Sequence, residues 1–256
     1  MPFLNVSGRS VPCRAIVFDK DGTLLHFLEL WGGWADDILE RTESRLREAG
    51  AVWTGDRERV MGTLRKPDGT LADYDRAGPL ALAAADEMTG VLAWQLYNAG
   101  IPWHESVDAV RGFARLADER LERERPVRPL PGLGRLLDEA RGAGIKLAVA
   151  TSDGTKAAEK HLLWAGLDGR FDCIAGRDAV PAGKPAPDLV LECCRRLGVE
   201  PGDAIMIGDG GSDMEMAKRA GAALAIGIAP DGGPRGHLEG ADIIIGGYGE
   251  LAAGPV

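Results

Sequence analysis

The sequence has few cysteines, and none of them forms a recognisable pairing or metal-binding pattern. No C-x-x-C pair occurs, and no histidine stands at the spacing of a zinc ligand. We therefore expect no zinc site and four reduced thiols, most of them buried as free cysteines usually are. They are Cys13, Cys173, Cys193 and Cys194.

Positive charge is also scarce. The 256 residues include 30 Lys and Arg against 39 Asp and Glu, which gives a formal net charge of -9. Proteins that bind nucleic acid usually gain affinity from clustered Lys and Arg that meet phosphates. The charge balance argues against a nucleic-acid partner, although one local positive site could still bind a small anionic substrate.

Long hydrophobic runs are missing as well. Nowhere do 18 apolar residues follow one another, and the N-terminal "MPFLNVSGRS" has no basic start followed by an apolar segment. The composition, 45% hydrophobic and 27% charged, is that of an ordinary globular protein. We expect a cytoplasmic protein without a membrane partner.

Six short apolar runs, each typical of a buried strand, lie near the N-terminus and in the second half of the chain. Helical patterns separate most of them, which indicates βαβ units and a mostly parallel sheet. We therefore predict an α/β fold. The runs are residues 15–18, 145–150, 172–176, 204–208, 223–228 and 242–246.

The residues between the first two runs have a different pattern of apolar residues. Apolar residues recur at helical spacing in 30–46, 80–97 and 107–121, and no convincing strand pattern interrupts them. We predict that residues 26–125 form an all-helical domain inserted into a core made of residues 1–25 and 126–256.

Polar side chains follow three of the predicted strands. Parallel strands end at one edge of a sheet, and ligands of open α/β sheets bind beyond that edge. We expect these side chains to converge there. They are Asp19 and Asp21, then Thr151, Ser152 and Asp153, then Asp209 and Asp213.

Such a group of carboxylates cannot stay fully ionised without a cation. Hard oxygen ligands of this kind suit Mg²⁺. Lys184 lies in a loop restricted by Pro185 and Pro187 and could bring a second positive charge to the same cleft. With the Thr151 hydroxyl and the Ser152 amide, these parts describe a phosphate site that contains its own nucleophile.

Four motifs in order carry a resemblance to a known family. "DKDGT", "ATSDG", "GKPAPD" and "GDGGSDMEMAKRAG" resemble the four motifs of the haloacid-dehalogenase-like hydrolase superfamily. "PLPGLGRLLDEARGAG" is similar to the segment that re-enters the core in its phosphoglycolate phosphatase and beta-phosphoglucomutase branch. The resemblance implies a doubly wound Rossmann-like sheet with an alpha-helical cap inserted after the first motif.

The resemblance also implies catalytic roles. Asp19 would attack phosphorus and form an aspartyl-phosphate. Asp21 would protonate the leaving oxygen and then activate water. Thr151 would hold the phosphoryl group, and Lys184 would offset charge on it and on Asp19.

For the metal, the resemblance implies Mg²⁺ held by Asp19, the Asp21 carbonyl and Asp209, with Asp213 as ligand or as partner of a ligand. One departure from the family pattern is Lys20, which stands where an apolar residue is usual. Strand alternation would turn Lys20 away from the cleft, so we expect it to have little effect.

Further residues are predicted to bind phosphate or substrate. Four lie in the motifs, and three lie at the hinge or in the cap. The other histidines, among them His161, support no argument. The predicted contacts are Gly22, Thr23, Ser152, Asp153, His26, Arg65 and Arg76.

These residues favour a Mg²⁺-dependent phosphatase that acts on a small phosphorylated metabolite such as phosphoglycolate or a sugar phosphate. The alternatives are a phosphomutase, a phosphonate hydrolase that uses Lys66 as a Schiff base, and a phosphate-binding regulatory protein without catalysis. The dehalogenases of this superfamily lack the second aspartate of "DKDGT", so the resemblance implies phosphoryl transfer rather than dehalogenation. The sequence identifies neither the substrate nor the oligomeric state.

Overall fold

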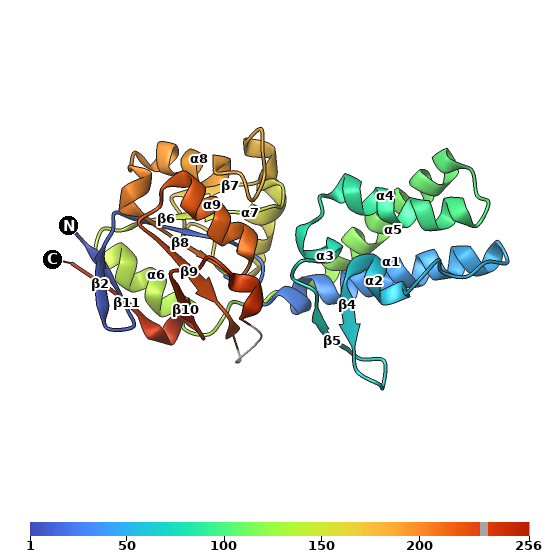
Figure 1. The fold of residues 1–256 in the computed structure, drawn as a ribbon, viewed down its shortest axis with the longest axis horizontal. Helices are drawn as coiled ribbons and strands as arrows, with labels where there is room; N and C mark the ends of the chain where they lie inside the picture. Colours follow the sequence, from blue (N-terminus) through green and yellow to red (C-terminus); the bar gives the residue numbers. More distant parts are fainter. Residues whose placement is uncertain (231–234, 256) are drawn as a thin grey trace. The chain divides into compact units, whose positions relative to one another are not determined.

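The computed structural model describes residues 1–230 and 235–255. The chain forms two compact units, one made of Met1–His26 and Val127–Val256 and the other of Phe27–Pro126. Figure 1 shows both units, and each has its own hydrophobic core.

The first unit is built on a six-stranded sheet in the order β10-β9-β8-β3-β6-β7. Every neighbouring pair of strands is parallel, so the predicted α/β fold class is confirmed. All six predicted strands are present: β3 (Ala15–Phe18), β6 (Lys146–Ala150), β7 (Cys173–Ala175), β8 (Ala204–Gly208), β9 (Leu224–Ile228) and β10 (Ile243–Ile245).

Helices connect and cover these strands (Figure 1). They are α6 (Leu133–Gly142), α7 (Thr155–Trp164), α8 (Asp188–Leu197) and α9 (Gly211–Ala220), with short 3-10 turns at Arg177–Ala179, Pro201–Asp203, Gly236–Leu238 and Tyr248–Glu250. Because helices cover the sheet, the sequences of its strands are mostly apolar and do not alternate between apolar and polar residues. The four cysteines are buried, as expected.

A second, smaller sheet in this unit was not predicted. Its antiparallel strands, in the order β11-β1-β2, are β1 (Phe3–Val6), β2 (Arg9–Pro12) and β11 (Leu251–Gly254). The strands are four residues long, and β1 and β2 mix polar with apolar side chains, so the local pattern is weak. Pairing between the two ends of the chain is visible only in three dimensions (Figure 1).

The second unit is mainly helical. Its helices are α1 (Phe27–Glu48), α2 (Arg57–Met61), α3 (Pro79–Leu82), α4 (Ala85–Asn98) and α5 (Trp103–Glu124), and α5 packs against both α1 and α4. The helix expected over 80–97 is broken at Ala83 and Ala84, because the backbone is extended there and the Glu87 carboxylate accepts a hydrogen bond from the Ala84 N–H (2.8 Å).

The expectation that this unit is all-helical was wrong at one place. β4 (Thr63–Arg65) and β5 (Leu71–Tyr74) form an antiparallel hairpin between the helical stretches predicted at 30–46 and 80–97. The strands are three and four residues long, too short for a periodic pattern, and their pairing depends on the turn in which the Lys66 N–H donates to the Thr70 carbonyl. Among the described residues, no helix is long and apolar enough to cross a membrane.

Candidate active site

Three neighbouring strands of the large sheet end in polar residues. β3 lies between β6 and β8, and the Asp19 N–H donates to the Ile207 carbonyl (2.9 Å) just beyond β3. The Thr151 N–H donates to the Ala175 carbonyl (3.0 Å) just beyond β6. Asp19, Thr151 and Asp209 therefore leave the sheet at its carboxyl edge, where open α/β sheets bind ligands.

Three carboxylates meet at this edge. One oxygen from each of Asp19, Asp209 and Asp213 lies within 4.8 Å of the other two. Asp213 is in the first turn of α9, where its Oδ2 accepts a hydrogen bond from the Gly210 N–H (3.0 Å). Lys184 forms ion pairs with Asp19 and with Oδ1 of Asp213, the second at 2.7 Å. Asp213 therefore caps its helix and faces the cluster at the same time.

The cluster carries more negative than positive charge. Burial raises the pKa of Asp19 to about 7; Lys184 opposes this shift and Asp213 adds to it. Burial, together with the charges of Asp19 and Asp213, also holds the pKa of Asp209 well above its usual range. Burial would lower the pKa of Lys184, but the two carboxylates that face it raise the pKa above its ordinary value. One lysine does not neutralise three carboxylates, so the cluster favours a cation.

The oxygen atoms of the cluster are suitable ligands for a small divalent cation. They are carboxylate oxygens, the hard ligands that Mg²⁺ prefers, and they lie within 4.8 Å of one another at the end of a parallel sheet. The carboxylate of Asp21 is not part of the cluster. The resemblance had assigned the backbone carbonyl of Asp21, not its carboxylate, to the metal.

Gly22 and Thr23 both lie against the carboxylate of Asp209. Gly22 has a φ of +81°, and a Cβ placed on it would lie 2.0 Å from Oδ2 of Asp209. Thr23 Oγ1 donates to Oδ1 of Asp209 at 3.2 Å. The sequence suggested that both residues contact phosphate. That remains a prediction, whereas their contacts with Asp209 are present in the structure.

The expectation for Lys20 was wrong. Lys20 is fully buried, and its Nζ donates to Oδ1 of Asp21 at 2.6 Å. The same nitrogen lies 3.0 Å from Oδ2 of Asp153. Strand alternation does not apply here because β3 ends at Phe18 and the chain turns directly afterwards, with the Leu24 N–H donating to the Lys20 carbonyl (2.8 Å).

The polar residues of the second motif, "ATSDG", have different surroundings. Thr151 is buried at the end of β6, and its Oγ1 accepts a hydrogen bond from the Asp153 N–H (3.2 Å). Ser152 is exposed, and the cap of α7 is Gly154. Asp153 was expected to bind substrate, but the structure gives its carboxylate a partner in Lys20.

His26 and Arg76 were also predicted to contact substrate. The His26 N–H donates to the Arg128 carbonyl (3.0 Å), and its ring Nε2 is buried without a hydrogen-bond partner in the described part of the chain. Arg76 donates to Oδ1 of Asp73 (2.9 Å) and stacks over the ring of Tyr74. A substrate contact for either residue remains a prediction.

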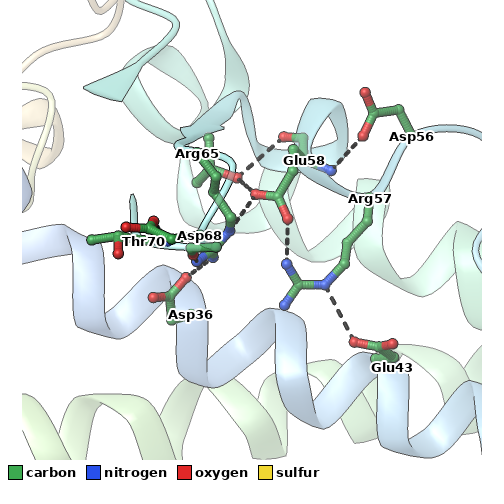
Figure 2. A network of polar contacts seen from close by, with 10 residues as sticks. Asp36, Glu43, Asp56, Arg57, Glu58, Arg65, Asp68 and Thr70 are labelled. Atoms are coloured by element: carbon green, nitrogen blue, oxygen red, sulfur yellow. Dashed lines mark hydrogen bonds and ion pairs between the residues drawn. The ribbon is translucent and has the colours of Figure 1, made fainter. Parts of the chain in front are cut away.

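Arg65 belongs to an ionic network within the second unit, which Figure 2 shows. Its Nε donates to Glu58 (2.9 Å), and its Nη2 forms an ion pair with Asp36 on α1. Its Nη1 donates to the Gly69 carbonyl in the β4–β5 turn (2.9 Å). Arg65 therefore links the hairpin to α1 and α2, and a role in specificity remains a prediction.

Two residues near the candidate site lie outside every motif. His161 on α7 is buried, and its Nδ1 lies 3.2 Å from Nζ of Lys20. Tyr248 is buried and donates from its hydroxyl to the Thr23 carbonyl (2.8 Å). His161 occupies an ordinary helical position and Tyr248 a short turn, so the sequence contained no signal for either.

Comparison with known proteins defines the class of this protein. The family model described as haloacid dehalogenase-like hydrolase matches residues 13–221. The match covers most of the chain and all four motifs, so the chain belongs to this family, and the resemblance stated from the sequence is confirmed.

Individual relatives share substantial identity with the chain. It is 31% identical to "Phosphorylated carbohydrates phosphatase" of Thermotoga maritima over 84% of this chain and 85% of that protein. It is 36% identical to "Phosphoglycolate phosphatase" of Aquifex aeolicus over 41% of this chain and 51% of that protein. The chain thus spans about half the length of two curated relatives that it matches, 52% of one and 51% of the other.

A solved structure of similar fold is also known. The structure of a HAD phosphatase from Thermococcus onnurineus matches with a TM-score of 0.63 and 27% identity, over 93% of this chain and 95% of that chain.

Proposed function

We propose that this protein is a Mg²⁺-dependent phosphatase that hydrolyses a small phosphate monoester of the phosphoglycolate or sugar-phosphate type. The observation that carries the proposal is the buried carboxylate cluster, in which Asp19 is paired with Lys184 beside Asp209 and Asp213. The family supports hydrolysis, and the names of the relatives support phosphate esters as substrates.

The reaction proceeds in two displacements. An oxygen of Asp19 attacks phosphorus, the bond between phosphorus and the leaving oxygen breaks, and Asp21 gives that oxygen a proton. Water then attacks the aspartyl-phosphate, Asp21 takes a proton from it, and the bond to Asp19 breaks. One ester and one water give one alcohol and one inorganic phosphate, and both aspartates return to their starting state.

Other residues hold charge in place during both displacements. Lys184 offsets the negative charge of Asp19 and of the phosphoryl oxygens, and the Thr151 hydroxyl binds one of those oxygens. Asp19, Asp209 and Asp213 would hold Mg²⁺, which supplies electrostatic stabilisation of the phosphoryl group when it is bound.

We assign residues 26–125 the role of a cap that selects the substrate, and residues 1–25 and 126–256 that of the catalytic core. The partner is a small phosphorylated metabolite in the cytoplasm, with neither nucleic acid nor membrane involved. The acidic net charge supports the exclusion of nucleic acid.

The phosphonate alternative gains no support from Lys66. This residue is exposed in the β4–β5 turn, whereas a lysine that forms a Schiff base is usually desolvated or placed beside another cation. For the phosphomutase alternative, the test is product analysis with a hexose phosphate: transfer to a second hydroxyl gives an isomeric sugar phosphate, and hydrolysis gives inorganic phosphate.

The Asp19→Asn variant tests the proposed function. The unaltered protein should release phosphate from p-nitrophenyl phosphate and from members of a panel of phosphorylated metabolites, and removal of Mg²⁺ with EDTA should stop the release. Asp19→Asn should lower kcat by at least about 10³-fold because the amide cannot act as the nucleophile. Asp168→Asn, at an exposed position, is the matched control and should leave kcat unchanged. Turnover by Asp19→Asn at the unaltered rate would refute the mechanism.

A further inference from the structure

A buried group of charged side chains lies beside the carboxylate of Asp21. The Nζ of Lys20 is 2.6 Å from Oδ1 of Asp21, 3.0 Å from Oδ2 of Asp153 and 3.2 Å from Nδ1 of His161. Lys20 is 0% exposed and His161 is 2% exposed. Neither Lys20 nor His161 has a role in the mechanism above.

Burying a lysine costs free energy unless opposite charges compensate. Burial would lower the pKa of Lys20, but Asp21 and Asp153 raise it above its ordinary value. Burial would likewise raise the pKa of Asp153, but Lys20 and His161 hold it below its usual range. Two carboxylate oxygens within 3.0 Å of the Lys20 nitrogen, one from Asp21 and one from Asp153, supply the compensating charge.

The partners of Lys20 are fixed independently of the turn that carries Asp21. Asp153 is held through its backbone, where its N–H donates to Thr151 Oγ1 (3.2 Å) and its carbonyl accepts from the Arg177 N–H (2.8 Å). His161 is in α7, and its ring packs against Trp164 with centroids 5.3 Å apart. The ammonium of Lys20 thus ties the loop after β3, which carries both Lys20 and Asp21, to the loop after β6 and to α7.

We propose that Lys20 is a positioning residue for Asp21: anchored by Asp153 and His161, its ammonium holds one oxygen of the Asp21 carboxyl so that the other oxygen delivers and accepts the proton. This inference rests on the proposed function, since it concerns the proton transfers of the two displacements. It assigns no bond making to Lys20 itself. Lys20 keeps its proton, and Asp21 exchanges a proton with the leaving oxygen and then with water.

The experiment uses the dependence of the first displacement on the leaving group. An alkyl leaving oxygen needs a proton as its bond to phosphorus breaks, whereas p-nitrophenolate leaves without one. The probes are p-nitrophenyl phosphate and the alkyl phosphate that the unaltered protein hydrolyses best, with 2-phosphoglycolate tried first. The quantity measured is kcat/KM, which reports the first displacement.

Lys20→Met removes the ammonium and keeps most of the side-chain volume. We expect kcat/KM to fall by about 30-fold or more for the alkyl phosphate and by less than about 5-fold for p-nitrophenyl phosphate. Asp21→Asn should show the same selective loss and serves as the reference. Lys156→Met, at an exposed position of α7, is the matched control and should leave both values unchanged.

A second variant guards against loss of the fold. Lys20→Met alone leaves the partly buried Asp153 carboxylate without the Lys20 ammonium, which destabilises the fold. The double variant Lys20→Met/Asp153→Asn removes both charges and should recover most of the melting temperature lost in the single variant. Its selective loss with the alkyl phosphate should persist, because Asp21 still lacks its anchor.

Three outcomes overturn the inference. Equal losses for both substrates in the double variant would mean that Lys20 only maintains the structure. Unchanged kcat/KM for the alkyl phosphate would mean that Asp21 needs no anchor. If the unaltered protein hydrolyses neither substrate, the proposed function fails and the inference fails with it. The first two outcomes, by contrast, leave the phosphatase assignment intact.

Discussion

Gly22 occupies a position where two constraints act on the same residue. Its φ of +81° is in the left-handed region that glycine adopts without strain. A side chain there would also overlap the Asp209 carboxylate, since the Cβ would lie 2.0 Å from Oδ2. The close approach keeps Asp209 beside the turn after β3, where Thr23 donates to it.

Gly22→Ala should therefore destabilise the protein and displace Asp209. We expect the free energy of unfolding to fall by about 2 kcal/mol or more, of which backbone strain accounts for about 1 kcal/mol. We also expect half-maximal activity to need a higher Mg²⁺ concentration. Denaturant unfolding and a Mg²⁺ titration of activity measure the two effects. Gly144→Ala is the control, because Gly144 has a φ of +79° with nothing within 4 Å of the added Cβ. Equal losses in both variants would show that the contact with Asp209 is unimportant.

At the scale of elements, the β4–β5 hairpin depends on a network centred on Glu58 (Figure 2). Glu58 lies on α2, and its carboxylate accepts hydrogen bonds from Thr63, Arg65 and Arg57. Burial would raise the pKa of Glu58, but these donors lower it below its ordinary value. One carboxylate therefore joins α2 to the first strand of the hairpin.

Replacing Glu58 should weaken this unit more than replacing a neighbouring acid. Glu58→Gln removes the charge that three donors share, and we expect a loss of about 1 kcal/mol in the free energy of unfolding. Glu43→Gln removes only the ion pair with Arg57 at 3.3 Å, in which the Glu43 side chain is 40% exposed. It should cost less than about 0.5 kcal/mol. Urea unfolding of both variants gives the comparison. Indistinguishable midpoints would exclude the proposed importance of the network.

At the scale of the whole molecule, the carboxylate cluster links stability to pH and to Mg²⁺. In the metal-free protein the pKa of Asp19 is raised from 3.8 to about 7, and that of Asp209 is raised as well. The folded protein therefore keeps protons that the unfolded chain has already released between pH 3.8 and about 7. The resulting stabilisation is fully present below the unfolded pKa and is lost as pH rises through the folded pKa.

Without metal, the free energy of unfolding contributed by the cluster should fall between pH 5 and pH 8. Mg²⁺ binds the ionised carboxylates, so it should raise the melting temperature more at pH 8 than at pH 5. Thermal unfolding with EDTA and with Mg²⁺ at both pH values tests this. Asp19→Asn removes one of the raised groups and should flatten the pH dependence. An unchanged slope in that variant would show that Asp19 is not among the groups responsible.

The sequence by itself determined the parallel sheet and the carboxyl edge at which its polar residues end. Runs such as 147–150 and 204–208 are apolar throughout because both faces of such a sheet are covered. Parallel strands bring Asp19, Thr151 and Asp209 to one edge in any fold of this class. Patterns within single segments indicate which strands are buried and that they run parallel, so the sheet and its carboxyl edge could be predicted from the sequence.

Only the tertiary structure decided where the charges pair. Lys20 was expected to face away from the site, yet the turn directly after β3 directs it to Asp21 and Asp153. Lys20 and His161 are 141 residues apart, and the β4–β5 hairpin and the small sheet of both chain ends likewise depend on pairings between short segments. Such contacts depend on where the backbone turns and on which side chains share a buried space. The sequence pattern of one segment predicts neither.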